Sequence, residues 1–184
     1  MDGEVKDGSL NIYLHEYDKL KDEQIQRIGF RDNMIYVNLV AVGGVAAFAV
    51  SDVTHLHVLL IIPWVCLVLG WTYLVNDEKI SAIGRYIRLV LVESLRVKLD
   101  VSESQLLGWE IAHRDDKHRK QRKLFQLFID EITFCLSGIA AVGLFWFRLP
   151  SAGIVWLIVS LFEVVLLIAL AYQMILYADL RRGR

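Results

Sequence analysis

Four long apolar stretches constrain this chain more than any other feature of its sequence. They cover roughly residues 34–52, 56–75, 130–148 and 152–177. A helix needs about 20 apolar residues to cross the hydrocarbon core of a membrane, and each stretch approaches that length. The connecting residues 53–55 and 149–151 leave room only for turns. We therefore expect an all-α, polytopic integral membrane protein with four transmembrane helices.

Positive charge is distributed unevenly over the segments between these stretches. Three segments that share one side of the membrane hold 19 of the 20 Lys and Arg residues: five in 1–33, eleven in 76–125 and three in 178–184. Only Arg148 lies on the other side. Because cationic loops stay in the cytoplasm, the pattern predicts that both termini and the middle segment are cytoplasmic.

The same pattern divides the chain into five segments. We expect a cytoplasmic N-terminal helix (1–33), a transmembrane hairpin (34–75), a cytoplasmic helical segment with a basic cluster (76–125), a second hairpin (126–177) and a basic tail (178–184).

Helical periodicity predicts where the cytoplasmic helices lie. The N-terminal helix is expected to start at Gly8-Ser9 with Ser9 as its cap, and two more helices are expected over 77–98 and 110–125. The helix 77–98 is apolar on two sides, which indicates that it is sandwiched between helices or protomers.

Chemical motifs are scarce in this sequence. It contains no nucleophile elbow and no Gly-rich phosphate loop, so we predict neither an enzyme nor a bound cofactor. His55 and His57 flank the outer turn, but their spacing is not that of a helical metal-ligand pair, and we predict no metal site. Cys66 and Cys135 lie inside apolar stretches and are expected to be free thiols.

Glu163 is the most informative polar residue of the apolar stretches. It lies near the middle of the fourth stretch, where an ionisable side chain is costly unless it faces protein or water. One interpretation is a pore or polar cavity. The other is a structural hydrogen bond to a neighbouring helix, with Asn38 or Thr133 as the partner.

Asp130 and Glu131 open the third stretch on its cytoplasmic side. They are interpreted either as acids near the lipid headgroups, balanced by Arg122 and Lys123, or as part of an acidic ring at the mouth of a cation pore.

A basic cluster precedes the third stretch. It contains Arg114, Lys117, Arg119, Lys120, Arg122 and Lys123, with Trp109 nearby. Such a cluster sets topology and attracts anionic headgroups. It could equally bind the phosphates of a polyanion, with Trp109 stacking on a base.

Three sequence segments carry a resemblance to a known family. They are Gln26-Arg27-Ile28-Gly29-Phe30-Arg31-Asp32, the stretch from Asn76-Asp77 to Arg88, and Gly108-Trp109-Glu110. With these the chain resembles, over roughly residues 13–180, small bacterial membrane effectors of anti-phage systems, specifically the channel effectors of Hailong-type defence. The Asn76-Asp77 segment also has a purely structural interpretation, in which Asp77 and Glu78 begin a helix directly after a span.

This resemblance implies a homo-oligomeric ion channel in the bacterial inner membrane. A short single-stranded DNA or nucleotide signal, made by a partner nucleotidyltransferase, would hold the channel closed from the cytoplasmic side. The residues expected to bind phosphate are Arg85, Arg88, Arg114, Lys117, Arg119 and Lys120. Trp109 and Tyr86 are the expected base-stacking residues, and Glu163, Asp130, Glu131 and Asn38 the expected pore or polar-interior residues. The alternative is a non-conducting membrane anchor that recruits a cytoplasmic partner through its N-terminal helix.

Overall fold

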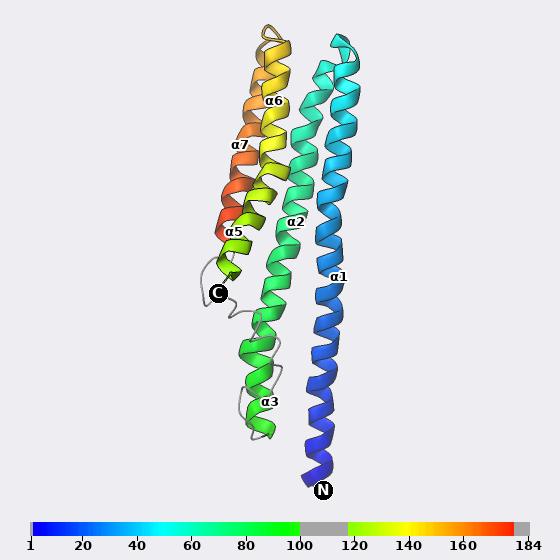
Figure 1. Cartoon of the computed structure of the whole chain (residues 1–184), viewed down its shortest axis with the longest axis vertical. Helices are drawn as coiled ribbons and strands as arrows, with labels where there is room; N and C mark the ends of the chain where they lie inside the picture. Colours follow the sequence, from blue (N-terminus) through cyan, green and yellow to red (C-terminus); the bar gives the residue numbers. More distant parts are fainter. Residues whose placement is uncertain (1, 100–117, 179–184) are drawn as a thin grey trace.

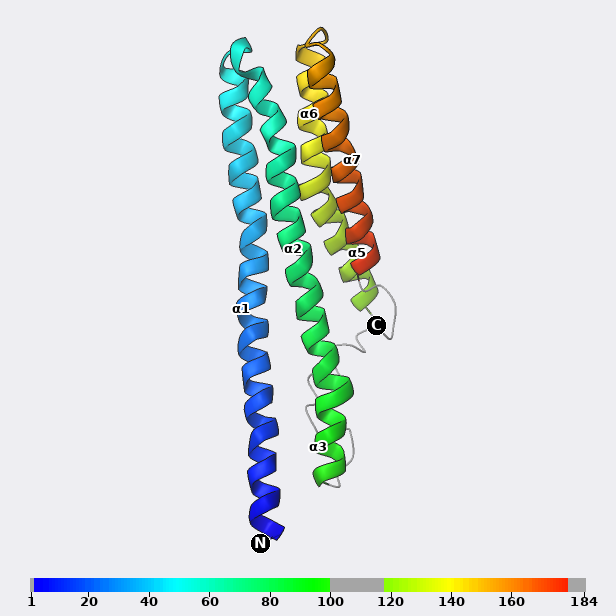
Figure 2. The ribbon, with the colours of Figure 1, turned by 180° about the vertical axis from the view of Figure 1, so that it is seen from behind.

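A computed structural model describes residues 2–99 and 118–178. Over these ranges the chain is almost entirely helical, without strands, and folds into two antiparallel hairpins that lie side by side (Figures 1 and 2). Four of its helical stretches are long and apolar enough to cross a membrane: Leu10–Ser51, Val53–Leu99, Lys120–Arg148 and Ile154–Tyr177. The protein is therefore an all-α, multi-pass membrane protein, as the sequence predicts.

The first arm of the first hairpin is one uninterrupted helix, α1 (Asp2–Ser51). The expected start at Ser9 is wrong, because α1 already runs through Gly8 and Ser9. A glycine inside a helix costs only about 1 kcal/mol, which the helical residues on either side outweigh.

The second arm is also continuous, although its geometry changes along its length. Asp52 caps it by accepting a hydrogen bond from the backbone N–H of Thr54 at 2.8 Å. A 3₁₀ helix (Val53–Leu60) leads into α2 (Ile61–Tyr86), a π-helical segment (Ile87–Leu91) and α3 (Val92–Leu99).

The interpretation of Asp77 and Glu78 as the start of a helix is therefore wrong. Both residues lie well inside α2. No proline follows the second span before Pro150, and Gly84 is accommodated inside α2, so nothing ends the helix at the membrane surface.

The second hairpin is shorter. Its first arm consists of α5 (Arg119–Asp130), a π-helical segment (Glu131–Leu136) and α6 (Ser137–Arg148). The chain turns at Gly153, whose φ of 94° suits glycine, and returns as α7 (Ile154–Tyr177). Of the helix expected over 110–125, residues 110–117 lie outside the described ranges.

Both turns lie at one end of the bundle, here called the turn end (Figure 1). The opposite end, here called the termini end, receives both ends of the chain. At 1.5 Å per residue α1 is about 75 Å long, whereas a hydrocarbon core is about 30 Å thick. The first hairpin therefore extends well beyond the second, and this extension (residues 10–30 and 80–99) is here called the stalk (Figure 2).

Apolar packing holds each part of the bundle. Near the turn end all four arms contribute to one core, which includes Ala49, Leu59, Ile62, Phe145 and Leu167. A second core follows towards the termini end around Phe134 and Leu170.

The stalk has a small core of its own, in which α3 and the preceding π segment pack on α1. Ile87, Leu91 and Leu95 contact apolar residues of α1 from Leu10 to Leu20. Of the two apolar sides expected for 77–98, this one is buried. The second side, Leu89 and Val92, is divided, because Leu89 is 66% exposed whereas Val92 is only 2% exposed. Val97 is also exposed, at 71%.

Candidate functional site in the bundle interior

The interior face of α7 carries Glu163 at its centre. The buried residues of this helix are Ser160, Glu163, Leu167, Leu170 and Met174, and their three- and four-residue spacing places them on one side. Helix α7 has no sharp break, so Glu163 is held at a fixed position near the middle of the span. Its exposed fraction is only 2%.

Neither carboxylate oxygen of Glu163 has a hydrogen-bond partner among the described residues. The indole of Trp64 on α2 lies near the carboxyl group, but its geometry falls short of a hydrogen bond. No Lys, Arg or His side chain among the described residues acts on it. Glu163 is therefore a buried carboxyl without an ionic or hydrogen-bonding partner.

The expected hydrogen bond from Glu163 to Asn38 or Thr133 is wrong, because those two residues bond to each other. The amide Nδ2 of Asn38 donates to the backbone oxygen of Thr133 at 2.7 Å. The Ser137 hydroxyl donates to the same oxygen at 2.6 Å, and it lies 3.3 Å from the Cys66 thiol. The Oδ1 atom of Asn38 is buried and has no hydrogen-bond partner in the described ranges.

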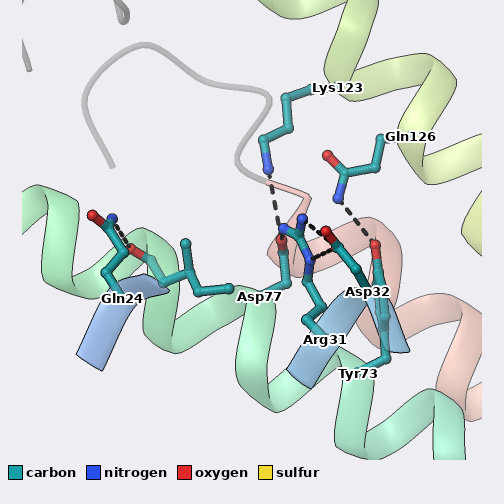
Figure 3. Close-up of polar contacts among 8 residues, drawn as sticks. Gln24, Arg31, Asp32, Tyr73, Asp77, Lys123 and Gln126 are labelled. Carbon is teal, nitrogen blue, oxygen red and sulfur yellow. Dashed lines mark hydrogen bonds and ion pairs between the residues drawn. The ribbon is translucent and has the colours of Figure 1, made fainter. Parts of the chain in front are cut away.

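A second polar cluster lies nearer the termini end, where α1, α2 and α5 meet. We define the Asp77 cluster as Arg27, Arg31, Asn76, Asp77 and Lys123; Figure 3 shows Arg31, Asp77 and Lys123. The Arg31 guanidinium donates to Asp77 Oδ1 at 2.7 Å, and Lys123 Nζ lies 3.6 Å from Asp77 Oδ2. Arg27 donates to Asn76 Oδ1 at 3.2 Å. The cluster therefore joins both hairpins through one carboxylate.

Arg31 is held by more than one acceptor. It also donates to Asp32 at 2.8 Å, and its guanidinium lies 5.9 Å from the centre of the Tyr73 ring. Burial lowers the pKa of Arg31, but the hydrogen bond to Asp32 and the charge of Asp77 outweigh that effect and raise the pKa above its ordinary value. Arg31 is therefore a permanent cation in this cluster.

Asp130 lies beside the Asp77 cluster on the interior side of α5. It is 7% exposed and the Tyr73 hydroxyl lies against it. That hydroxyl also accepts a hydrogen bond from Gln126 at 3.0 Å (Figure 3). A cavity of about 20 Å³ borders Tyr73, Asp77 and Asp130, which is room for about one water molecule.

Glu131 is placed differently from its neighbour Asp130. It lines an apolar groove of about 490 Å³ with α5 residues such as Phe128 and with Ile175 of α7. It is half-buried, and its Oε1 atom has no partner among the described residues. Within one protomer, the two acids therefore do not share a site.

The expected phosphate-binding residues are distributed over two helical arms. Arg85 and Arg88 are half-buried on the first hairpin, whereas Lys120 is exposed at the start of α5. The Tyr86 hydroxyl donates to Glu16 of α1 at 2.7 Å. Arg119 begins α5, but its side chain lies outside the described part. Arg114, Lys117 and Trp109 also lie outside the described ranges.

Further polar groups continue the interior towards the turn end. The indole N–H of Trp146 donates to Ser160 at 3.0 Å. His57 is exposed, and its ring centre lies 4.7 Å from that of Trp156.

Among the described residues no three or more His, Cys, Asp or Glu side chains are grouped as metal ligands. Cys66 and Cys135 are free and buried.

Sequence reasoning missed the pairing inside the Asp77 cluster. Arg31 and Asp77 lie at comparable distances before and after the first turn, 21 residues before and 25 residues after Asp52. Opposite charges placed in this way on two antiparallel arms are a signal that could have identified the contact.

The chain matches no protein-family model, no curated protein and no solved structure.

Proposed function

We propose that this protein conducts ions across a bacterial inner membrane as a homo-oligomer, and that it serves as the membrane effector of an anti-phage system. A nucleotide or short oligodeoxynucleotide on the cytoplasmic side holds it closed. The observation that carries this proposal is the carboxyl group of Glu163, which is buried in the middle of the fourth span and has no partner on either oxygen among residues 2–99 and 118–178.

A buried polar group without a partner lowers stability. Its desolvation costs roughly 1–3 kcal/mol in proteins, and more for a charged group. A bundle that only anchors a partner would be more stable with leucine at this position. An ionisable side chain inside a membrane therefore favours a function that uses its charge or its proton.

The charge distribution supports an orientation in which both termini face the cytoplasm. Towards the termini end, the described arms carry the Lys and Arg residues of segments 1–33, 76–99 and 118–125, whereas Arg148, at the end of α6, lies near the turn end. By the positive-inside rule the termini end, with the stalk, is cytoplasmic.

The position of the cations supports an anionic ligand on that side. Arg85 follows Asp77 by eight residues, or about 12 Å along α2, and Lys120 precedes Lys123 by three residues, or about 4.5 Å along α5. Since Asp77 and Lys123 are in contact, Arg85 and Lys120 are separated by roughly 8 Å along the bundle axis. A strand of a few nucleotides spans that distance, and its phosphates would neutralise such cations. The resemblance to Hailong-type channel effectors agrees with this ligand class.

The experiment that tests the proposal is ion flux from liposomes that contain the purified protein, with and without a short oligodeoxyadenylate. We expect flux without the oligonucleotide and at least a tenfold reduction with it. A charge-reversed variant, Arg85→Glu with Lys120→Glu, should conduct but no longer respond. Empty liposomes with the oligonucleotide are the control. Flux that does not respond to any oligonucleotide would refute the ligand, and no flux from folded protein would refute conduction.

The exposed apolar side of the stalk favours a second candidate function. Leu89 and Val97 are largely exposed outside the apolar stretches, as expected of a surface that holds a partner. Under this alternative the protein is a non-conducting anchor. Absence of flux from well-folded oligomers, with or without the oligonucleotide, would favour it.

A further inference from the structure

The helices around Glu163 pack too closely for a hydrated metal ion to pass between them. A Cβ atom added at Gly138 of α6 would lie 2.7 Å from Cδ1 of Leu167 and 3.4 Å from the backbone of Pro63. At Gly70 of α2 it would lie 2.7 Å from Cδ2 of Leu170. Glycine is therefore needed for α2, α6 and α7 to approach this closely, and the described interior has the density of a packed core.

Polar groups nevertheless recur through this packed interior. At the cytoplasmic end Asp130, the Tyr73 hydroxyl and a cavity for about one water molecule are adjacent. Towards the turn end follow the Thr133 carbonyl with its Asn38 and Ser137 donors.

Glu163 lies beyond these groups. Gly138 contacts Leu167, which places Ser137 and Leu167 at similar depth. Glu163 is four residues from Leu167, or about 6 Å along α7. Ser160, bonded to Trp146, lies about 4.5 Å further on. The exposed ring of His57 then lies against Trp156 at the turn end.

These groups are offset along the bundle axis by roughly 4–7 Å, a spacing that one or two water molecules, admitted by small movements of the packed helices, would bridge. A proton can move along such a series by successive transfer, whereas a metal ion would need an open aqueous path. A carboxyl group in the centre can accept a proton from one side and release it to the other.

We infer that the conducted ion is a proton, and that it crosses through the interior of each protomer by way of Glu163. This inference rests on the proposed function and specifies its substrate. A proton that enters near His57 binds the Glu163 carboxylate and forms its O–H bond. That bond breaks when the proton passes through water to the Ser137–Thr133 region and on to Asp130. No electron is transferred, and Glu163 returns to its carboxylate form.

The test measures proton flux and the flux of other ions in parallel liposomes made from the same protein preparation. A trapped pH-sensitive dye reports proton entry under a potassium diffusion potential set with valinomycin. Parallel liposomes, loaded with sodium- or chloride-sensitive dyes, report other ions. We expect proton entry in the wild type, at least a tenfold loss in Glu163→Gln, and no more than a threefold loss in Glu163→Asp, which keeps an ionisable carboxyl.

Two controls make the result specific. Glu93→Gln makes the same carboxyl-to-amide change in the stalk, where Glu93 is exposed, and should leave proton entry unchanged. A hydrophobic carbodiimide, which couples to protonated carboxyls in apolar surroundings, should inhibit the wild type and modify Glu163 as identified by mass spectrometry. This measurement needs no mutation and applies if Glu163→Gln does not fold.

The outcomes separate the inference from the proposed function. Sodium or chloride flux that persists in Glu163→Gln, without selective proton entry, would overturn the inference and leave conduction intact. Absence of every flux from folded wild-type protein would overturn both. Proton entry that survives both Glu163→Gln and the carbodiimide would exclude Glu163 from the path.

Discussion

Asp77 and Glu163 are both buried carboxyl groups of the same bundle, but their surroundings are opposite. Asp77 receives a hydrogen bond from Arg31 at 2.7 Å and has Lys123 at 3.6 Å. Within the described part of the chain, Glu163 has no hydrogen-bond partner on either oxygen. Their exposed fractions, 9% and 2%, are similar. The two residues therefore differ not in their burial but in whether their carboxyl groups have hydrogen-bonding or ionic partners.

Asp77 is thus an acid that holds helices together, whereas Glu163 is an acid that lowers the stability of the fold. The Asp77 carboxylate connects α1, α2 and α5, which belong to both hairpins, so its removal should weaken the fold. Glu163 connects nothing, so its removal should strengthen the fold. Measurements of stability can test this contrast without any knowledge of a ligand.

The largest effect is expected from Asp77→Leu. This change leaves Arg31 and Lys123 partly buried without their carboxylate, and breaking one side of a buried ion pair costs about 3 kcal/mol or more. The free energy of unfolding in detergent micelles, followed by circular dichroism in urea, should fall by that amount. A change below about 0.5 kcal/mol would show that the Asp77 cluster does not hold the hairpins together.

Glu163→Leu is expected to raise the free energy of unfolding, in contrast to Asp77→Leu. Replacing an unpartnered buried carboxyl by an apolar side chain removes its desolvation cost, so the free energy of unfolding should rise by about 2 kcal/mol. The same urea titration measures this change. If stability falls instead, Glu163 has a structural partner and the contrast with Asp77 fails.

A smaller effect is expected from Lys123→Met, which distinguishes the contributions of the two cations that face Asp77, Arg31 and Lys123. Lys123 Nζ is 3.6 Å from Asp77, beyond hydrogen-bonding distance, so its loss should cost about 1 kcal/mol. Double-mutant cycles of Asp77 with Lys123 and with Arg31 should give the larger coupling energy for Arg31. Equal coupling energies would contradict the geometry.

The smallest effect is expected from Asp32→Asn, which serves as the matched control for Asp77. Asp32 also bonds to Arg31, but its side chain is 51% exposed. Exposed ion pairs contribute little, so the free energy of unfolding should change by less than about 0.5 kcal/mol. A loss as large as that of Asp77→Leu would show that burial does not decide the strength of these pairs.

Much of the fold was predictable because membrane spans depend on local composition. The four apolar stretches predict the four spans, and the absence of proline before residue 34 is consistent with the uninterrupted helix α1. The helix starts expected at Ser9 and Asp77 were wrong for a common reason. Good capping residues end or begin a helix only where the chain leaves helical geometry, and here it does not.

The interior of the site was less predictable, because it depends on which helices face one another. The sequence singles out Glu163 and Asn38 as polar residues inside spans, and both are buried. It does not specify that Asn38 bonds to the Thr133 carbonyl, because that contact joins the two hairpins. Nor does composition indicate the two π-helical segments, which arise from packing along the arms.

Those π-helical segments have a mechanical consequence. The two segments are Ile87–Leu91 and Glu131–Leu136. A π-helical turn contains more residues than an α-helical turn. If one residue is released from the wide turn, all of the helix on one side rotates by about 100° and moves by about 1.5 Å. The second segment lies between the basic start of α5 and the intramembrane helix α6. A one-residue shift in the second segment would therefore rotate the basic start of α5 relative to α6, while α6 keeps its position in the bundle.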